Sequence, residues 1–207
     1  MKRVAFIGAG SHLRSVYDSL DKTSYEVVGC LDNLLETSAT EEGIPVLGKL
    51  DEFDMLNINH VDEVMVCIGD LKMRERLLET VTAYGLKMFN VIDDSAIVSS
   101  SAIIGEGTFI GKRAIVNANA TIGSGCIINS GSIIEHDVRI DSNVHVAPGA
   151  VVCGGVEIGA STLIGANATV IQKISIGNHA VIGAGSTIIR DVKNDTTVVG
   201  TPGKEIK

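Results

Sequence analysis

Residues 98–140 read VSSSAIIGEGTFIGKRAIVNANATIGSGCIINSGSIIEHDVRI, and this stretch contains the pattern that decides the fold. Isoleucine or valine stands at every sixth position, and the run extends beyond the stretch in both directions. It comprises Ile92, Val98, Ile104, Ile110, Val116, Ile122, Ile128, Ile134, Ile140, Val146, Val152, Ile158, Ile164, Val170, Ile176, Ile182 and Ile188. A period of six fits neither a 3.6-residue helix nor a two-residue strand alternation. The unit is therefore a short strand plus a corner, the signature of a parallel β-helix.

The positions beside the periodic residue fit a chain that turns corners of constant size. Small residues often stand two positions before it, and glycine often follows directly, as at Gly105, Gly123 and Gly159. Because glycine tolerates positive φ, we expect these glycines to form the tight turns. Three rungs of six residues would close one triangular coil, which predicts 18 residues per coil and about five coils.

Length and composition predict two domains and exclude several classes of partner. The 207 residues, 45% of them hydrophobic, suffice for two cores, and the change of pattern near residue 92 separates residues 1–91 from residues 92–207. A formal charge of -8 makes nucleic acid an unsuitable partner. The sequence has no 18-residue apolar run and no signal-peptide pattern at its start, so we expect no membrane insertion and a cytoplasmic location. The four scattered cysteines are expected to be buried thiols.

The first domain alternates predicted strands and helices. The strands are expected at residues 3–7, 25–31, 63–68 and 87–91, with helices after residue 12 and at residues 73–84. Such alternation predicts a Rossmann-like parallel sheet with ligand sites at the carboxyl ends of its strands.

The first strand runs into Gly8-Ala9-Gly10-Ser11-His12, a glycine turn that permits three interpretations. Leu13 replaces the third glycine of the GxGxxG fingerprint, which weakens the case for NAD. Asp32 follows at about the right distance for a ribose contact, so a nucleotide attached to another group remains an alternative. The third interpretation is a purely structural turn.

Ionisable side chains in the repeat region must point outward, because a narrow aliphatic core does not accommodate them. Glu135-His136-Asp137 follows the periodic Ile134 directly, while Asn129 lies seven residues before His136 and His145 nine residues after it. A histidine beside a carboxylate can act as a general base, since the carboxylate stabilises the imidazolium that forms. The alternative is that these residues are merely a solvated corner.

Taken together, these motifs resemble one family, the bacterial sugar acyltransferases of the sialic acid O-acetyltransferase and UDP-aminosugar N-acetyltransferase type (NeuD/PglD). The resemblance covers nearly the whole chain. Its segments are residues 8–12, Leu31-Asp32-Asn33, residues 43–48 (GIPVLG), residues 134–137 (IEHD), residues 145–149 (HVAPG) and residues 200–204 (GTPGK).

The resemblance implies a left-handed β-helix, a homotrimer, and acetyl-CoA bound in a cleft between adjacent prisms. It assigns the general base to His136, with Asp137 tuning it and Asn129 in the active site. It assigns the acetyl-CoA site to His145, Ala166 and Ala184. In nucleotide-sugar members the acceptor is held by positions matching Gly10, Ser11, His12, Asp32, Asn33 and Gly69. The family turn usually reads Gly-His-Gly, whereas here His12 lies between Ser11 and Leu13.

The implied reaction is acetyl transfer from acetyl-CoA to an amine or hydroxyl of a bacterial surface sugar, nucleotide-linked in the main interpretation. We expect neither a metal nor NAD. One alternative is a sialic acid O-acetyltransferase that acts on a free or CMP-linked sugar, and another is a non-catalytic protein that binds sugar nucleotides. A zinc enzyme of the carbonic anhydrase type would need three converging imidazoles. His179 lies 43 residues beyond His136 at a different rung position, which disfavours the zinc enzyme.

Overall fold

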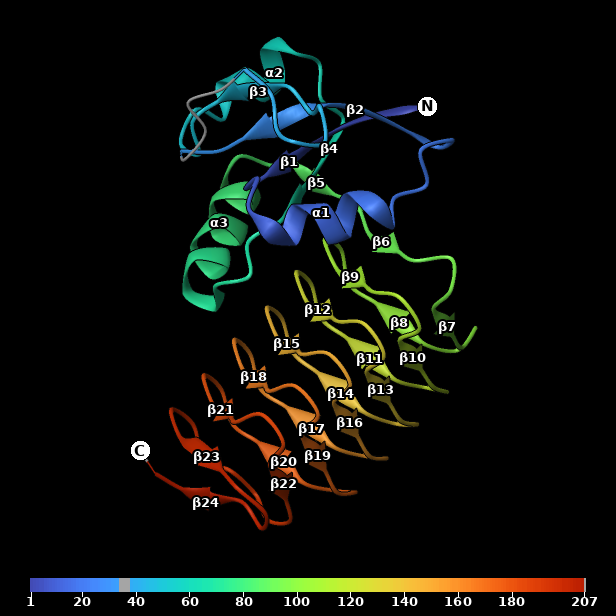
Figure 1. Ribbon diagram of the computed structural model, residues 1–207, viewed down its shortest axis with the longest axis vertical. Coiled ribbons are helices and arrows are strands. Elements are labelled where there is room, and N and C mark those ends of the chain that lie inside the picture. Colours follow the sequence, from blue (N-terminus) through green and yellow to red (C-terminus); the bar gives the residue numbers. More distant parts are fainter. Residues whose placement is uncertain (34–37, 207) are drawn as a thin grey trace. The chain divides into compact units, whose positions relative to one another are not determined.

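The computed structural model describes residues 1–33 and 38–206, and the chain divides into two compact units (Figure 1). The first unit is Met1–Val91, and the second begins at Ile92. Within the described residues, no helix is long and apolar enough to cross a membrane.

The first unit is a parallel α/β domain, as predicted. Its strands are β1 (Lys2–Ile7), β2 (Tyr25–Leu31), β3 (Val46–Gly48), β4 (Glu63–Val66) and β5 (Lys87–Met88), in the sheet order β3-β2-β1-β4-β5. Its helices are α1 (Ser11–Asp18), α2 (Asp54–Ile58) and α3 (Leu71–Ala83). The predicted strand at residues 87–91 is divided, because β5 ends at Met88 and Val91 belongs to a separate short strand, β6 (Val91–Ile92), in another sheet. Helix α3 begins earlier than predicted, since the Asp70 side chain caps it by accepting from Met73 N–H.

The second unit is the predicted left-handed parallel β-helix (Figure 1). Sheet I contains β7 (Ile97–Val98), β10 (Ile115–Val116), β13 (Ile133–Ile134), β16 (Val151–Val152), β19 (Thr169–Val170) and β22 (Thr187–Ile188). Sheet II contains β8 (Ile103–Ile104), β11 (Thr121–Ile122), β14 (Arg139–Ile140), β17 (Glu157–Ile158) and β20 (Ser175–Ile176). Sheet III contains β6 (Val91–Ile92), β9 (Phe109–Ile110), β12 (Ile127–Ile128), β15 (His145–Val146), β18 (Leu163–Ile164), β21 (Val181–Ile182), β23 (Thr197–Val199) and β24 (Lys204–Glu205).

From β6 to β22, neighbouring strands within each sheet are one coil of 18 residues apart, as in the pairing of Ile115 with Ile133. From β6 to β22, successive strands belong to different sheets, so each coil turns three corners. We name the corners by the sheets they join. Corner III–I follows the strands of sheet III, corner I–II follows those of sheet I, and corner II–III follows those of sheet II.

The interior of the β-helix is filled by the periodic residues. From Ile110 to Ile188 each of them is at most 3% exposed, and the residues two positions earlier form a second buried row, as at Ala114, Ala150 and Ala180. Burial of this aliphatic column stabilises each coil against its neighbours.

The prediction that Gly105, Gly123 and Gly159 supply positive φ is wrong. Positive φ occurs two residues later, for example at Gly107 and Gly125. The reason for glycine at the first corner position is the close approach of the next coil. A Cβ atom on Gly105 or Gly123 would lie 2.6 Å from backbone atoms of that coil.

The three outer faces of the β-helix differ in chemistry. On sheet II the outward side chains are exposed, and all except Ile103 are polar, including Thr121, Arg139 and Glu157. On sheets I and III they are mostly apolar and at least half-buried, including Ile115, Ile133 and Val151 on sheet I and Ile127, Leu163 and Val181 on sheet III. Sheet II is therefore suited to water, whereas sheets I and III present apolar rows.

Candidate active site

His136 and Asp137 lie side by side at corner I–II, immediately after β13. The Asp137 backbone has φ of 60°, a left-handed conformation that aspartate tolerates better than most residues. His136 Nδ1 lies 2.8 Å from Asp137 Oδ2, and both side chains are exposed. Because an ionised carboxylate only accepts hydrogen bonds, the Nδ1 atom must be the donor. The neutral imidazole therefore carries its proton on Nδ1 and has a lone pair on Nε2.

The coils on either side contact this dyad. Asn119, one coil earlier, donates from Nδ2 to Asp137 Oδ1 over 3.3 Å. The hydrogen bond from His136, followed by the one from Asn119, holds the pKa of the Asp137 carboxyl below its usual value. Gly154, one coil later, lies against the ring, because a Cβ atom there would be 2.7 Å from His136 Nε2. Gly155 N–H donates to the His136 carbonyl over 3.0 Å.

Asn129 and His145 form a second pair at corner III–I. Asn129 follows β12, and His145 lies in β15, the neighbouring strand of sheet III. Ser130 N–H donates to Asn129 Oδ1, so the amide turns its Nδ2 toward His145 Nε2, which is 3.4 Å away. An amide nitrogen only donates, so His145 Nε2 is the acceptor and its ring carries the proton on Nδ1.

The predicted acetyl-CoA residues Ala166 and Ala184 lie at the same corner as Asn129 in later coils, one residue after Gly165 and Gly183, which occupy the position of Asn129. Ala166 is half-buried and Ala184 is exposed. Corner III–I therefore groups four predicted site residues, Asn129, His145, Ala166 and Ala184. His136 and Asp137 lie at the next corner along the chain, six residues of coil away. Within one chain the predicted catalytic set is thus divided between two corners.

The predicted acceptor residues gather at the carboxyl ends of the adjacent strands β2, β1 and β4. Gly10, Ser11 and His12 follow β1, Asp32 and Asn33 follow β2, and Gly69 lies beyond β4. Asp32 is buried, and its Oδ2 accepts from Ala9 N–H over 2.6 Å. The exposed Asn33 accepts from Leu50 N–H through its Oδ1 over 2.9 Å. Asp32 therefore fixes the glycine turn itself, a role that its spacing did not predict.

Sequence reasoning missed Arg74, which is only 1% exposed although it lies on α3. Its Nη1 donates to the carbonyls of Ile68 and Gly69, over 3.0 Å and 3.2 Å, at the end of β4. Burial first, and the Arg74 charge second, lower the pKa of His12 to about 4. His12 is therefore neutral at physiological pH. A surface helix gives no sign of such an arginine, because arginine in a helix is usually exposed.

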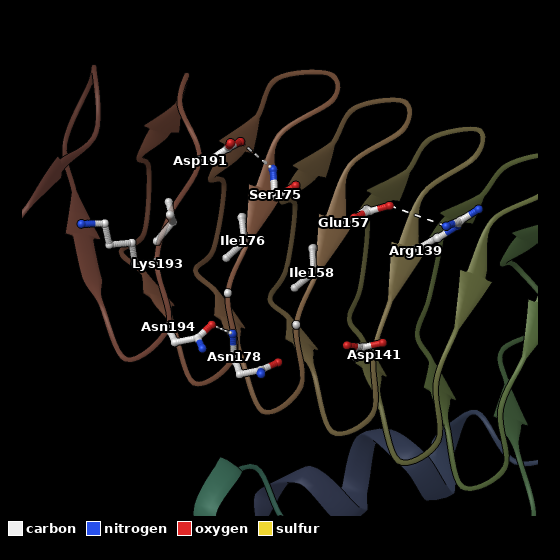
Figure 2. A pocket seen from close by; sticks show the side chains of 13 residues that line it. Arg139, Asp141, Glu157, Ile158, Ser175, Ile176, Asn178, Asp191, Lys193 and Asn194 are labelled. Carbon is white, nitrogen blue, oxygen red and sulfur yellow. Dashed lines mark hydrogen bonds and ion pairs between the residues drawn. The ribbon is translucent and has the colours of Figure 1, made fainter.

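A separate polar groove of about 440 Å³ lies on sheet II and corner II–III (Figure 2). Ile158 and Ile176 lie beneath it, and Arg139 and Glu157, which pair on the neighbouring strands β14 and β17, form an ion pair of 3.6 Å at one end of it. Several of its polar side chains accept hydrogen bonds from backbone N–H groups. Asp191 accepts from Ser175 N–H, and Asn194 accepts from Asn178 N–H. None of the predicted site residues lines this groove.

The thiols near the site are poor nucleophiles. Cys126 is fully buried and donates to the Asp141 carbonyl. Burial, followed by the charge of Glu135, raises the pKa of the Cys153 thiol. Within residues 1–33 and 38–206, no three or more His, Cys, Asp or Glu side chains are placed to hold a metal ion.

Comparison with known proteins agrees with this architecture. A model of the PglD N-terminal domain matches residues 3–81, and the six-repeat bacterial transferase hexapeptide model matches residues 101–136, 119–154 and 155–190. PerB from Caulobacter crescentus, solved with CoA and GDP-perosamine, is 31% identical with a TM-score of 0.93. That match covers 100% of this chain and 98% of PerB.

The acetyltransferase domain of PglB from Neisseria gonorrhoeae FA1090, solved with acetyl coenzyme A, is 32% identical over 99% of each chain, with a TM-score of 0.90. WeeI from Acinetobacter baumannii AYE, at 24% identity and a TM-score of 0.80, shares the fold. Among curated proteins, the uncharacterised protein L142 of Acanthamoeba polyphaga mimivirus is 31% identical over 109 residues. The chain covers 21% of that protein's length.

The chain combines a hexapeptide β-helix with a parallel α/β unit, and over its whole length it is similar to enzymes solved with CoA or acetyl-CoA. These features define a hexapeptide-repeat acyltransferase. The chain belongs to the PglD/NeuD family of sugar acetyltransferases. The prediction of an acetyl-CoA-dependent sugar acetyltransferase is confirmed by these likenesses.

Proposed function

We propose that the enzyme transfers the acetyl group of acetyl-CoA to the amine of a nucleotide-linked amino sugar, with His136 as the general base. The observation that carries this proposal is the 2.8 Å contact between His136 Nδ1 and Asp137 Oδ2. It holds the proton on Nδ1 and leaves the lone pair of Nε2 for the acceptor. The choice of an amine is supported by PerB, a perosamine N-acetyltransferase.

The reaction needs no covalent enzyme intermediate. The acceptor nitrogen attacks the thioester carbonyl carbon, and a C–N bond forms while His136 Nε2 takes the proton that the nitrogen loses. The C–S bond then breaks, and the CoA thiolate leaves and can take the proton back from the imidazolium. The developing oxyanion needs a donor, for which Asn129 Nδ2 or a backbone N–H is suitable. Direct transfer is supported by the buried Cys126 and by the raised pKa of Cys153.

The N-terminal unit is proposed to bind the nucleotide-linked part of the acceptor through Gly10, Ser11, His12, Asp32, Asn33 and Gly69. These residues come from three adjacent strand ends, which is where parallel sheets bind nucleotides. Leu13 in place of the third glycine argues against NAD. We place the reaction in the cytoplasm, because all four cysteines are free thiols, as is usual in a reducing compartment.

The homotrimer is also proposed, with active sites shared between neighbouring copies. In a three-fold ring whose sheets I face the axis, corner III–I of one copy meets corner I–II of the next. This arrangement would bring Asn129 and His145 of one copy to His136 of another. It would also cover the apolar row of Ile115, Ile133 and Val151 on sheet I.

An acceptor screen tests the reaction. Purified protein is mixed with acetyl-CoA and with UDP-, CMP- or GDP-linked amino sugars, their hydroxyl analogues, or free sugars, and thiol release is followed. Release with a nucleotide-linked amine supports the proposal. Release only with hydroxyl acceptors, such as a free or CMP-linked sialic acid, would make the enzyme an O-acetyltransferase. Absence of release with every acceptor would instead indicate a sugar-nucleotide-binding protein without activity.

Complementation tests the shared site. His136→Ala and Asn129→Ala chains are prepared separately, then unfolded and refolded together in equal amounts. Suppose that each site takes His136 from one copy and Asn129 from its neighbour. In a random mixture about half of the copies carry each intact residue, so about one site in four has both, and activity returns to about a quarter of normal. Mixtures that stay as inactive as the separate variants would place both residues in the same chain's site.

A further inference from the structure

Asn119 is the second member of a side-chain column at the third position of corner I–II. The column contains Ser101, Asn119 and Asp137, each one coil after the last. Asn119 and Asp137 share the left-handed backbone, with φ of 59° and 60°. Asn119 N–H donates to Ser101 Oγ over 3.1 Å, and the Asn119 side chain donates to Asp137. The backbone of Asn119 is thus tied to the preceding coil while its amide reaches the following one.

The two carboxylate oxygens of Asp137 have different donors. Oδ1 accepts from Asn119 Nδ2 at 3.3 Å, and Oδ2 accepts from His136 Nδ1 at 2.8 Å. A carboxylate held at one oxygen has less freedom to rotate, so its second oxygen stays directed at the imidazole. An exposed side chain such as Asp137 otherwise samples several rotamers.

The ring is confined on its opposite side by Gly154, which leaves room for Nε2. The imidazole is therefore fixed by a chain of contacts through three successive coils, from Asn119 through Asp137 and His136 to Gly154. None of the motifs in the sequence singled out Asn119, because asparagine is common at left-handed corner positions and occurs there also at Asn143 and Asn167.

We propose that Asn119 is a positioning residue for the catalytic base, acting through Asp137 rather than on substrate. The inference rests on the proposed role of His136. By fixing the Asp137 carboxylate, Asn119 keeps the imidazole proton on Nδ1 and the lone pair of Nε2 directed toward the acceptor. Its amide must donate, so a side chain of the same shape that cannot donate is unable to replace it.

Two variants separate this role from a merely structural one. Asn119→Gly keeps the left-handed backbone and removes the donor. Asn119→Asp keeps the size and the tolerance of positive φ, but places a second carboxylate beside Asp137. His179→Gly is the matched control, because His179 has φ of 54° and lies exposed at corner II–III.

NMR provides a test that does not depend on turnover. The Asp137 carboxyl carbon is titrated, and the ring nitrogens of His136 are observed. In Asn119→Gly the pKa of Asp137 should rise toward its ordinary value, and the Nδ1–H tautomer should become less dominant. His179→Gly should change neither signal. An unchanged Asp137 titration and tautomer in Asn119→Gly would overturn the proposal, even if the enzyme acetylates sugars.

Kinetics gives the second test. We expect kcat to fall about 3- to 10-fold in Asn119→Gly and further in Asn119→Asp, with KM for acetyl-CoA unchanged. In an Asp137→Ala background, Asn119→Gly should add no further loss. If Asn119→Asp is as active as the unaltered enzyme, or if the losses add fully in the double variant, Asn119 does not act through Asp137. Should no acceptor support turnover at all, the proposed function fails, and the NMR result still decides the positioning role.

Discussion

The imidazole of His136 occupies the space beside Gly154 that a side chain at residue 154 would fill. A Cβ atom there would lie 2.7 Å from both Cε1 and Nε2 of the ring, closer than real contacts allow. Residue 118, one coil before His136 in the same column, is alanine. The backbone at this corner position therefore accommodates a Cβ atom. Glycine is required at residue 154 only because the His136 ring occupies the space that a side chain would fill.

We predict that Gly154→Ala displaces the imidazole and lowers kcat about 10-fold or more, because a displacement of about 1 Å is costly in a catalytic geometry. The melting temperature should change little, since the corner tolerates alanine. The same substitution in a His136→Ala background should have no effect on the residual rate. A full-activity Gly154→Ala enzyme would mean that the ring is not needed in this position.

His136→Ala should lower kcat by about 10² to 10⁴ while the fold is retained, since that is the usual contribution of a general base. The side chain is exposed and its removal leaves the aliphatic column untouched. Circular dichroism and sedimentation check the fold, and steady-state thiol release gives the rate. A loss of less than 10-fold in a normally assembled protein would remove His136 from the mechanism.

The period-six pattern was sufficient to predict the β-helix, because the fold is dictated by which residues face one narrow core. Each residue from Ile110 to Ile188 in that series is at most 3% exposed. The sequence pattern did not predict why glycine stands at the first corner position. The φ preference of glycine can be read from a single sequence, whereas a contact between coils 18 residues apart cannot. Gly105 is required by its approach to the backbone at residues 123 and 124.

From the residues alone, the candidate site could be predicted only where its members are neighbours in the chain, and the more distant members were assigned through the family resemblance. The dyad of His136 and Asp137 is contiguous, so its chemistry could be inferred directly. Asn119 and Gly154 act across the coil period, and nothing in their local sequence marks them. Arg74 was missed because its burial depends on the packing of α3 against the end of β4, which helical periodicity does not reveal.

Ile158→Asp should unfold the repeat domain. Ile158 is 2% exposed in the aliphatic column, and burying an unpaired carboxyl costs several kcal/mol against a stability of about 5 to 15 kcal/mol. Thr121→Asp is the control, because Thr121 is an exposed, outward position of the same sheet. Thermal unfolding followed by circular dichroism compares the two. An unchanged melting temperature for Ile158→Asp would show that the assigned register is wrong.

Asp32→Ala should weaken sugar-nucleotide binding at least 10-fold, because the glycine turn loses the acceptor for Ala9 N–H as well as a potential ligand group. Calorimetric titration with UDP-, CMP- and GDP-sugars and with NAD provides the measurement. Asp51→Ala, at an exposed position, serves as the control. Tight binding of NAD together with failure of every sugar nucleotide, or an Asp32→Ala variant with unchanged affinity, would contradict the assignment.

The N-terminal unit should lose stability as the pH falls from about 6.5 toward 4, because His12 must remain neutral in the folded state. Its pKa there is about 4, whereas the unfolded chain binds the proton near 6.5. The unfolded state therefore holds more protons in this range, and stability should drop by about 1 to 2 kcal/mol between pH 7 and pH 5.

Tyrosine fluorescence in urea measures the stability of this unit alone, because the chain has no tryptophan and all three tyrosines, Tyr17, Tyr25 and Tyr84, lie in this unit. His12→Gln should remove most of the drop, while His60→Asn, at an exposed site, should retain it. If His12→Gln shows the same pH dependence as the unaltered protein, the loss arises from other groups and His12 is not held neutral by burial.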